Sequence, residues 1–117
     1  MTNGKEYQRR RIKMINCKEE FLRHTAETRA EVKAAIIERY SNPREDEKAF
    51  VLPIGYTEDQ LRSFLQSIDF EYAGDNKHRA EIIGSIWYSD GSWSERDWYY
   101  EKEWWEHRVT PDISVCA

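Results

Sequence analysis

The feature that most constrains the fold is the aromatic stretch from Gly84 to His107, which holds all five tryptophans of the 117-residue chain. Its first part, 85–88, and the part from Trp93 onward are rich in β-branched and aromatic residues, which favour strands. Between them, Ser89-Asp90-Gly91-Ser92 has the Asp-Gly signature of a tight turn. The stretch is therefore predicted to form a β-hairpin over 82–107.

Charged residues interrupt the part from Trp93 onward, with five acids among the rings against two bases. A sheet with one packed face and one solvated face would account for this mixture. Contact with a partner would also account for it, because aromatic side chains carry much of the binding energy at interfaces. The candidate binding residues are Trp98, Tyr99, Tyr100, Glu101, Glu103, Trp104, Trp105 and Glu106.

Adjacent rings in the second half of the hairpin lead to a specific expectation about exposure. Neighbouring residues on a strand point to opposite faces, and a sheet covered on one side has only one core face. At least one of Trp104 and Trp105 should therefore be exposed. The same holds for at least one residue among 98–100.

The clearest helix start lies at Thr57, which forms a capping box with Gln60 and is followed by two acids at the positive end of the helix dipole. A one-sided apolar stripe then recurs at helical spacing. This pattern predicts a helix over 58–68 that packs on the hairpin sheet. The stripe consists of Leu61, Phe64, Leu65 and Ile68.

The first half of the chain is predicted to add one helix and two strands. A capping pattern at Asn16 and the apolar face formed by Phe21, Leu22, Thr25 and Ala26 predict a helix over 17–27. Residues 28–40 fit both a helix and a strand, and the β-branched residues near 32–37 favour the strand. The apolar run 49–52 is predicted to pair back on it. The expected fold is a single small α+β domain with an antiparallel sheet of about four strands and two helices.

Charge is distributed unevenly along the chain. Residues 1–13 hold five bases, including Arg9, Arg10 and Arg11, against one acid, for a net charge of +4, and the total of −4 leaves −8 for the rest. A basic, flexible arm over 1–13 is thus expected to precede an acidic domain over 14–117. An acidic body repels nucleic acid, whereas the arm could contact phosphate. No apolar run is long enough for a membrane span or a signal peptide, so a cytoplasmic location is expected.

Motifs for chemistry are missing from the sequence. It contains no nucleophile elbow, no glycine-rich phosphate loop and no His or Cys spacing typical of a metal site. Glu103 and His107 lie four residues apart, which would suit two metal ligands only on a helix. No enzymatic activity, metal or cofactor is therefore expected.

A resemblance covers about residues 50–113. The motifs that carry it are Gly-Tyr-Thr-Glu-Asp-Gln at 55–60, Ile-Asp-Phe-Glu-Tyr at 68–72, Ile-Trp-Tyr-x-Asp-Gly-x-Trp at 86–93, and Glu-Trp-Trp-Glu-His at 103–107. On these motifs the chain resembles a group of small proteins of lytic bacteriophages whose function is uncharacterised. It departs from their pattern at 76–80, at 97–102 and at Thr110.

The resemblance implies a phage-encoded accessory protein in the host cytoplasm, without implying an activity. We therefore expect it to bind and modulate a host bacterial protein, such as a nuclease, a defence effector or the transcription machinery. An inhibitor of the anti-CRISPR or anti-restriction type, acting through an acidic and aromatic surface, is one form of this hypothesis. The alternative is a nucleic-acid-associated module that uses the basic arm and exposed rings. The oligomeric state is left open.

Overall fold

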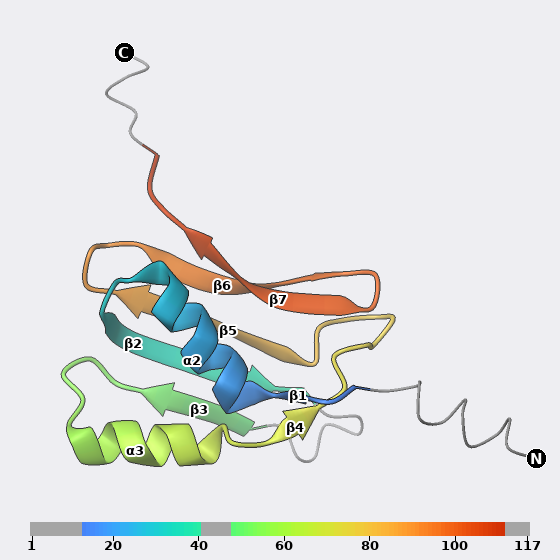
Figure 1. The fold of residues 1–117 in the computed structure, drawn as a ribbon, viewed down its shortest axis with the longest axis horizontal. Coiled ribbons are helices and arrows are strands. Elements are labelled where there is room, and N and C mark those ends of the chain that lie inside the picture. Colours follow the sequence, from blue (N-terminus) through green and yellow to red (C-terminus); the bar gives the residue numbers. More distant parts are fainter. Residues whose placement is uncertain (1–12, 41–47, 112–117) are drawn as a thin grey trace, which may run out of the picture.

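Two helices and two antiparallel sheets make up the α+β domain in the computed structural model, which describes residues 13–40 and 48–111. In chain order the elements are β1 (Ile15–Asn16), α2 (Cys17–Thr28), β2 (Val32–Arg39), β3 (Lys48–Leu52), α3 (Glu58–Ser67), β4 (Glu71–Tyr72), β5 (Ile82–Tyr88), β6 (Trp93–Tyr99) and β7 (Lys102–Arg108) (Figure 1). No helix among these residues is long and apolar enough to cross a membrane. The arm residues Arg9, Arg10 and Arg11 lie outside the described residues.

The larger sheet has the strand order β3-β2-β5-β6-β7, with every neighbouring pair antiparallel. The smaller sheet pairs β1 with β4 and so joins the start of α2 to the segment that follows α3. A hydrogen bond from the Cys17 amide to the Phe70 carbonyl, 2.8 Å long, extends this connection. The two helices are thereby held next to each other although 29 residues separate them in sequence.

Both helices pack on the same face of the larger sheet, which we call the inner face. In Figure 1, α2 crosses in front of this sheet. Phe21 of α2 and Phe64 of α3 meet edge to face with ring centroids 5.4 Å apart. They join one hydrophobic cluster with the alternate residues of the central strands, such as Ile37, Ile82 and Ile86. The core therefore lies between the helices and the inner face.

The two predicted strands in the first half of the chain are confirmed. β2 and β3 pair as expected, with Ala35 opposite Leu52, and residues 32–39 take the strand alternative. On its other side β2 pairs with β5, where Ile37 lies opposite Gly84. A Cβ atom on Gly84 would lie 2.3 Å from the Ile36 carbonyl oxygen, so glycine permits the close approach of these central strands.

The prediction for 82–107 was correct about the first turn and wrong about the number of strands. Residues from Trp93 onward form two strands, because the chain reverses at Tyr100 and Glu101. Both residues have positive φ angles, 46° and 68°, as a two-residue hairpin turn of type I′ requires. Asn-Gly would normally mark such a turn, and its absence hid the reversal. The larger sheet therefore has five strands, where about four were expected.

The helix over 58–68 is confirmed, ending at Ser67 with Ile68 as its C-terminal cap. The capping box is formed in both directions: the Thr57 hydroxyl accepts from the Gln60 amide, and the Gln60 side chain accepts from the Thr57 amide. Phe64 and Ile68 are buried, while Leu61 and Leu65 are half-buried against the core.

The helix over 17–27 is also confirmed, extending to Thr28, but its predicted apolar face was partly wrong. Phe21 is buried as expected, whereas Leu22 and Ala26 are exposed. The side that faces the sheet carries Glu20 and His24 as well as Phe21. Glu20 and His24 contact Arg96 and Ser94 on β6. The spacing of apolar residues in the helix does not predict these contacts.

Candidate binding surface and the buried network behind it

The outer face of the larger sheet, opposite the helices, presents tryptophan side chains to solvent. Trp87 on β5 lies opposite Trp93 on β6, and Trp104 on β7 lies opposite Asp97. Trp87 is 44% exposed and Trp104 is 36% exposed. Acidic side chains from the same face lie among these rings. We call this surface the outer patch, formed by Trp87, Trp93, Glu95, Asp97, Trp104 and Glu106.

The indole groups of the outer patch are oriented by neighbouring carboxylates. The Trp93 Nε1–H donates to Glu95 Oε1 over 2.7 Å, and the Trp104 Nε1–H donates to Glu106 Oε1 over 3.2 Å. In each case the acid lies two residues further along the strand and therefore on the same face. A bound partner would thus meet rings whose polar edges are already paired.

Two like charges face each other at the centre of the outer patch. Glu95 lies directly opposite Glu106 in the β6–β7 register, an arrangement that is destabilising between neighbouring strands. Arg108 relieves it only in part, since its Nε atom is 3.9 Å from Glu95 Oε1 while its Nη2 donates to both oxygens of Asp97 over 2.8 Å. The negative charge is therefore available to a cationic partner.

The predictions about exposed rings are confirmed. Trp104 is exposed and Trp105 is buried. At the β6–β7 turn Tyr99 and Tyr100 are both exposed, with ring centroids 5.6 Å apart. They form a second group of accessible rings beyond one end of the outer patch.

The candidate binding residues divide between the surface and the interior. Trp98 is half-buried and donates from Nε1 to the Asn76 carbonyl over 3.0 Å, and Glu101 forms an ion pair with Lys77. Glu103 and Trp105 are wrong as surface contacts, because both side chains point to the inner face and are buried. The remaining members lie at the surface, namely Tyr99, Tyr100, Trp104 and Glu106.

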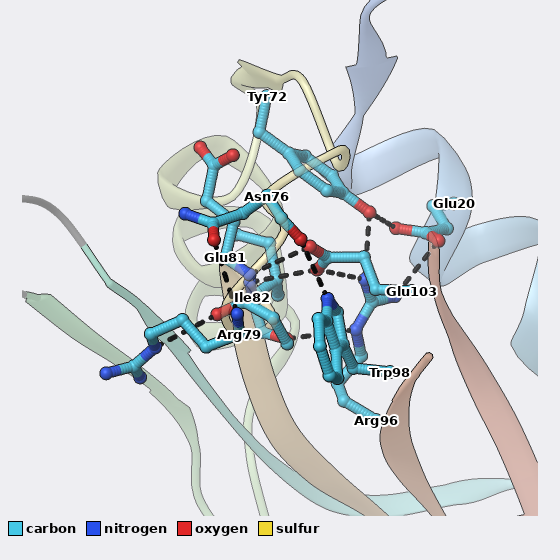
Figure 2. A network of polar contacts seen from close by, with 10 residues as sticks. Glu20, Tyr72, Asn76, Arg79, Glu81, Ile82, Arg96, Trp98 and Glu103 are labelled. Carbon is cyan, nitrogen blue, oxygen red and sulfur yellow. Dashed lines mark hydrogen bonds and ion pairs between the residues drawn. The ribbon is translucent and has the colours of Figure 1, made fainter. Parts of the chain in front are cut away.

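Glu103 instead belongs to a buried charge network on the inner face (Figure 2). Its carboxylate accepts from the backbone amides of Glu81 and Ile82 at 2.8 and 3.0 Å, and from Arg96 Nη2 at 2.7 Å. The side chain is fully buried, at 0% exposure. Because the amides lie at the start of β5 and Glu103 lies on β7, this carboxylate links two strands that are not neighbours.

Arg96 is the centre of the network, and its side chain is 1% exposed. Its Nη1 atom lies 2.9 Å from Glu20 Oε2 on α2, and its Nε–H donates to the Ile82 carbonyl over 3.2 Å. Burial acts to lower the pKa of this guanidinium, but the neighbouring carboxylates of Glu20 and Glu103 outweigh burial and raise it. Arg96 therefore remains charged and attaches α2 to the sheet.

Tyr72 completes the network from β4. Its hydroxyl donates to Glu20 Oε1 over 2.5 Å and accepts from Arg96 Nη2 over 2.9 Å. Burial raises the pKa of this phenol above its usual range. Burial also raises the pKa of the nearby Cys17 thiol to about 12, so that thiol is not a nucleophile at neutral pH. The network is thus a closed structural connection between α2, β4 and the larger sheet.

A second polar cluster on the inner face contains the residue types of a hydrolase but not their arrangement. His24 Nε2 and the Tyr88 hydroxyl each lie 2.7 Å from Ser94 Oγ, and Ser94 is fully buried. Ser92 Oγ donates to Asp90 Oδ1 and lies 2.9 Å from His107 Nε2. In a catalytic triad the carboxylate orients the histidine, whereas Asp90 here contacts the serine.

A cavity of about 370 Å³ lies beside Trp87, with Ala34, Ile54 and Gly91 in its lining. Across the described residues, 13–40 and 48–111, no group of three His, Cys, Asp or Glu side chains is placed to hold a metal ion.

The chain matches no protein-family description, no curated protein and no solved structure.

Sequence reasoning missed the network and four of the six residues of the outer patch. Trp87, Trp93, Glu95 and Asp97 share one face through simple alternation, and a hairpin register placed on the Asp-Gly turn would have grouped them. The network has no comparable signal. Its members Glu20, Tyr72 and Arg96 are separated by more than twenty residues each and meet only through the helix–sheet packing.

Proposed function

We propose that this protein is a non-enzymatic accessory protein that binds a basic surface of a host bacterial protein through the outer patch. The observation that carries the proposal is the like-charged pair Glu95 and Glu106 between Trp93 and Trp104 on the uncovered face. A partner that supplies lysine or arginine side chains would relieve the repulsion. The rings would supply the apolar contact.

The chemistry of the outer patch matches that of protein-binding surfaces. Tryptophan and tyrosine dominate the energetic centres of interfaces, and a rim of polar groups excludes water around them. The cavity beside Trp87 offers space for an apolar side chain of the partner, and Ile54 at its edge is exposed. Electrostatic complementarity would speed association and select basic partners.

The resemblance to small phage proteins supplies the biological setting of the proposal. Nucleases, defence effectors and the transcription machinery of the host all bind nucleic acid through basic grooves, and an acidic surface competes for such grooves. Inhibition of a defence nuclease, in the anti-CRISPR or anti-restriction manner, would follow from occupying its groove. The outer patch itself repels phosphate, which favours a protein partner over nucleic acid.

The test compares capture of host proteins by variants that differ only in the outer patch. Wild type, Glu95→Lys and Trp87→Ala are immobilised, exposed to nuclease-treated host lysate, and the bound proteins are quantified by mass spectrometry. The matched control is Glu58→Lys, which reverses an exposed acid on α3. We expect a basic host protein whose binding to purified variants falls about tenfold or more for the two patch changes, or about 1.4 kcal/mol, and is unchanged for the control.

Two outcomes would contradict the proposal. One is equal binding of the captured protein by wild type and both patch variants. The other is binding of purified DNA or RNA that is lost when residues 1–13 are deleted, which would favour the nucleic-acid module instead.

A further inference from the structure

The last strand of the larger sheet has a long, regular and free edge. β7 pairs with β6 on one side, and none of the described strands pairs with it on the other. It spans seven residues without proline or glycine, and its register with β6 runs unbroken from Lys102 to Arg108. The opposite edge strand, β3, has five residues and lies against α3. Long regular edges pair readily with another strand.

The turn at Tyr100 and Glu101 determines which backbone groups point to this free edge. It joins the closing pair Tyr99 and Lys102, and the closing pair of a two-residue hairpin exchanges both hydrogen bonds. Hydrogen-bonded and non-hydrogen-bonded pairs then alternate along the ladder. Counting from Lys102, alternate residues of β7 direct their backbone groups toward β6. The residues between them direct theirs to the free edge, and these are Glu103, Trp105 and His107.

We propose that a second copy of this chain occupies the free edge, with β7 antiparallel to the partner's β7 and the two-fold axis at Trp104. In this register Glu103 forms hydrogen-bonded pairs with the partner's Trp105, so the free backbone groups of both strands are used. Trp104 faces the partner's Trp104 in a non-hydrogen-bonded pair, where side chains come closest. Lys102 faces the partner's Glu106 on each side of the axis.

Charge complementarity selects this register over its neighbours. An axis at Trp105 would place Lys102 opposite the partner's Arg108, and an axis at Glu106 would place that acid opposite itself. Like charges directly opposite each other destabilise a strand pair. Only the Trp104 axis combines two Lys–Glu pairs with a tryptophan pair.

The side chains involved are free to make these contacts. Lys102 is exposed and forms no ion pair with any of the residues that the structure describes. Glu106 uses Oε1 to accept from the Trp104 indole, which leaves Oε2 for the partner's Lys102. Aromatic and opposite-charge pairs across neighbouring strands each stabilise a sheet.

The dimer would join two five-stranded sheets into one. Because the two-fold axis runs through the sheet, both outer patches lie on the same face of the joined sheet. Two patches on one rigid surface would bind a repeated or extended basic partner with avidity. The inference does not depend on the proposed function. Trp104 and Glu106 belong to both surfaces, but host-protein binding is tested at Trp87 and Glu95, and the dimer is tested at Lys102, Trp104 and Glu106.

The experiment is analytical ultracentrifugation of the full chain across a range of concentrations. Wild type is expected to sediment with twice the mass of the single chain. Lys102→Glu and Glu106→Lys should each give monomers, because each places like charges opposite one another twice. The double variant Lys102→Glu/Glu106→Lys should recover the dimer, since the exchanged charges pair again across the axis.

A matched control and a covalent test complete the design. Glu58→Lys reverses an exposed acid on α3, away from the edge and from Glu106, and should leave the dimer intact. Trp104→Cys should form a disulfide-linked dimer on mild oxidation, because the Cα atoms of a non-hydrogen-bonded pair are about 4.5 Å apart. Trp87→Cys, on the same face but away from the edge, should not.

A monomer at every concentration up to the millimolar range would overturn the proposal. So would a dimer that survives both single charge reversals, or one that the double variant fails to restore. Slow hydrogen exchange at the Glu103 and Trp105 amides in a monomer would show that another segment or molecule covers the edge.

Discussion

The charged residues on β6 and β7 have opposite roles on the two faces of the larger sheet. On the inner face Arg96 and Glu103 are buried, and each of them is bonded to backbone groups as well as to the other. On the outer face Glu95 and Glu106 oppose each other in contact with solvent. The inner charges hold the helix and strands together, whereas the outer charges lower stability and remain available for a partner. The effect of a charged residue in these strands on stability therefore depends on the face to which its side chain points, and not on how many charged residues the strand contains.

The largest expected difference between the faces comes from their arginines. Arg96→Met should lower the free energy of unfolding by about 3–5 kcal/mol, because it leaves the carboxylates of Glu20 and Glu103 without their buried cation. Arg108→Met on the outer face should cost at most about 1 kcal/mol, because its ion pair with Asp97 is partly solvated. Urea unfolding of both variants measures the difference. Equal losses would show that Arg96 is not the centre of the network.

The glutamates should differ in sign as well as size. Glu103→Gln keeps the shape of the side chain but removes the charge that accepts two backbone amides, and should cost about 1.5–3 kcal/mol. Glu106→Gln removes the repulsion with Glu95 and, at concentrations at which the chain is a monomer, should raise stability by about 0.2–1 kcal/mol. Thermal and urea unfolding report both values. A destabilised Glu106→Gln would mean that the outer pair is not in conflict, and the argument for a cationic partner would lose its basis.

The smallest expected effect is the pH dependence that His24 contributes from the inner face. Burial lowers the pKa of His24 below its ordinary value of 6.5, although Glu27 acts in the opposite direction. The unfolded chain therefore binds a proton at a higher pH than the folded chain does. This contribution to stability is complete above about pH 6.5 and is lost as the pH falls through the unfolded value toward the folded one.

The variant His24→Gln tests this assignment. It should remove part of the loss of stability between pH 7 and the folded pKa of His24, measured as the urea midpoint against pH. The control is His78→Gln, an exposed histidine in the loop before β5, which should leave the profile unchanged. A profile that is the same in wild type and His24→Gln would contradict the assignment.

Much of the local structure could be predicted from the sequence, because its causes lie within a few residues. The Thr57 capping box and the Asp90-Gly91 turn each depend on contacts or preferences that neighbouring residues define. The exposure of Trp104 against the burial of Trp105 follows from the alternation of a strand. Such features can be derived before the position of any other element is known.

The tertiary structure alone decided the rest. Tyr100 and Glu101 have no intrinsic preference for positive φ. Their turn is held by the pairing of β6 with β7, in which Asp97 lies opposite Trp104. Glu103 looked like a surface acid because the two amides and the guanidinium that bind it come from other strands. A buried charge is tolerated only where distant partners converge on it, and that convergence is a property of the packed fold.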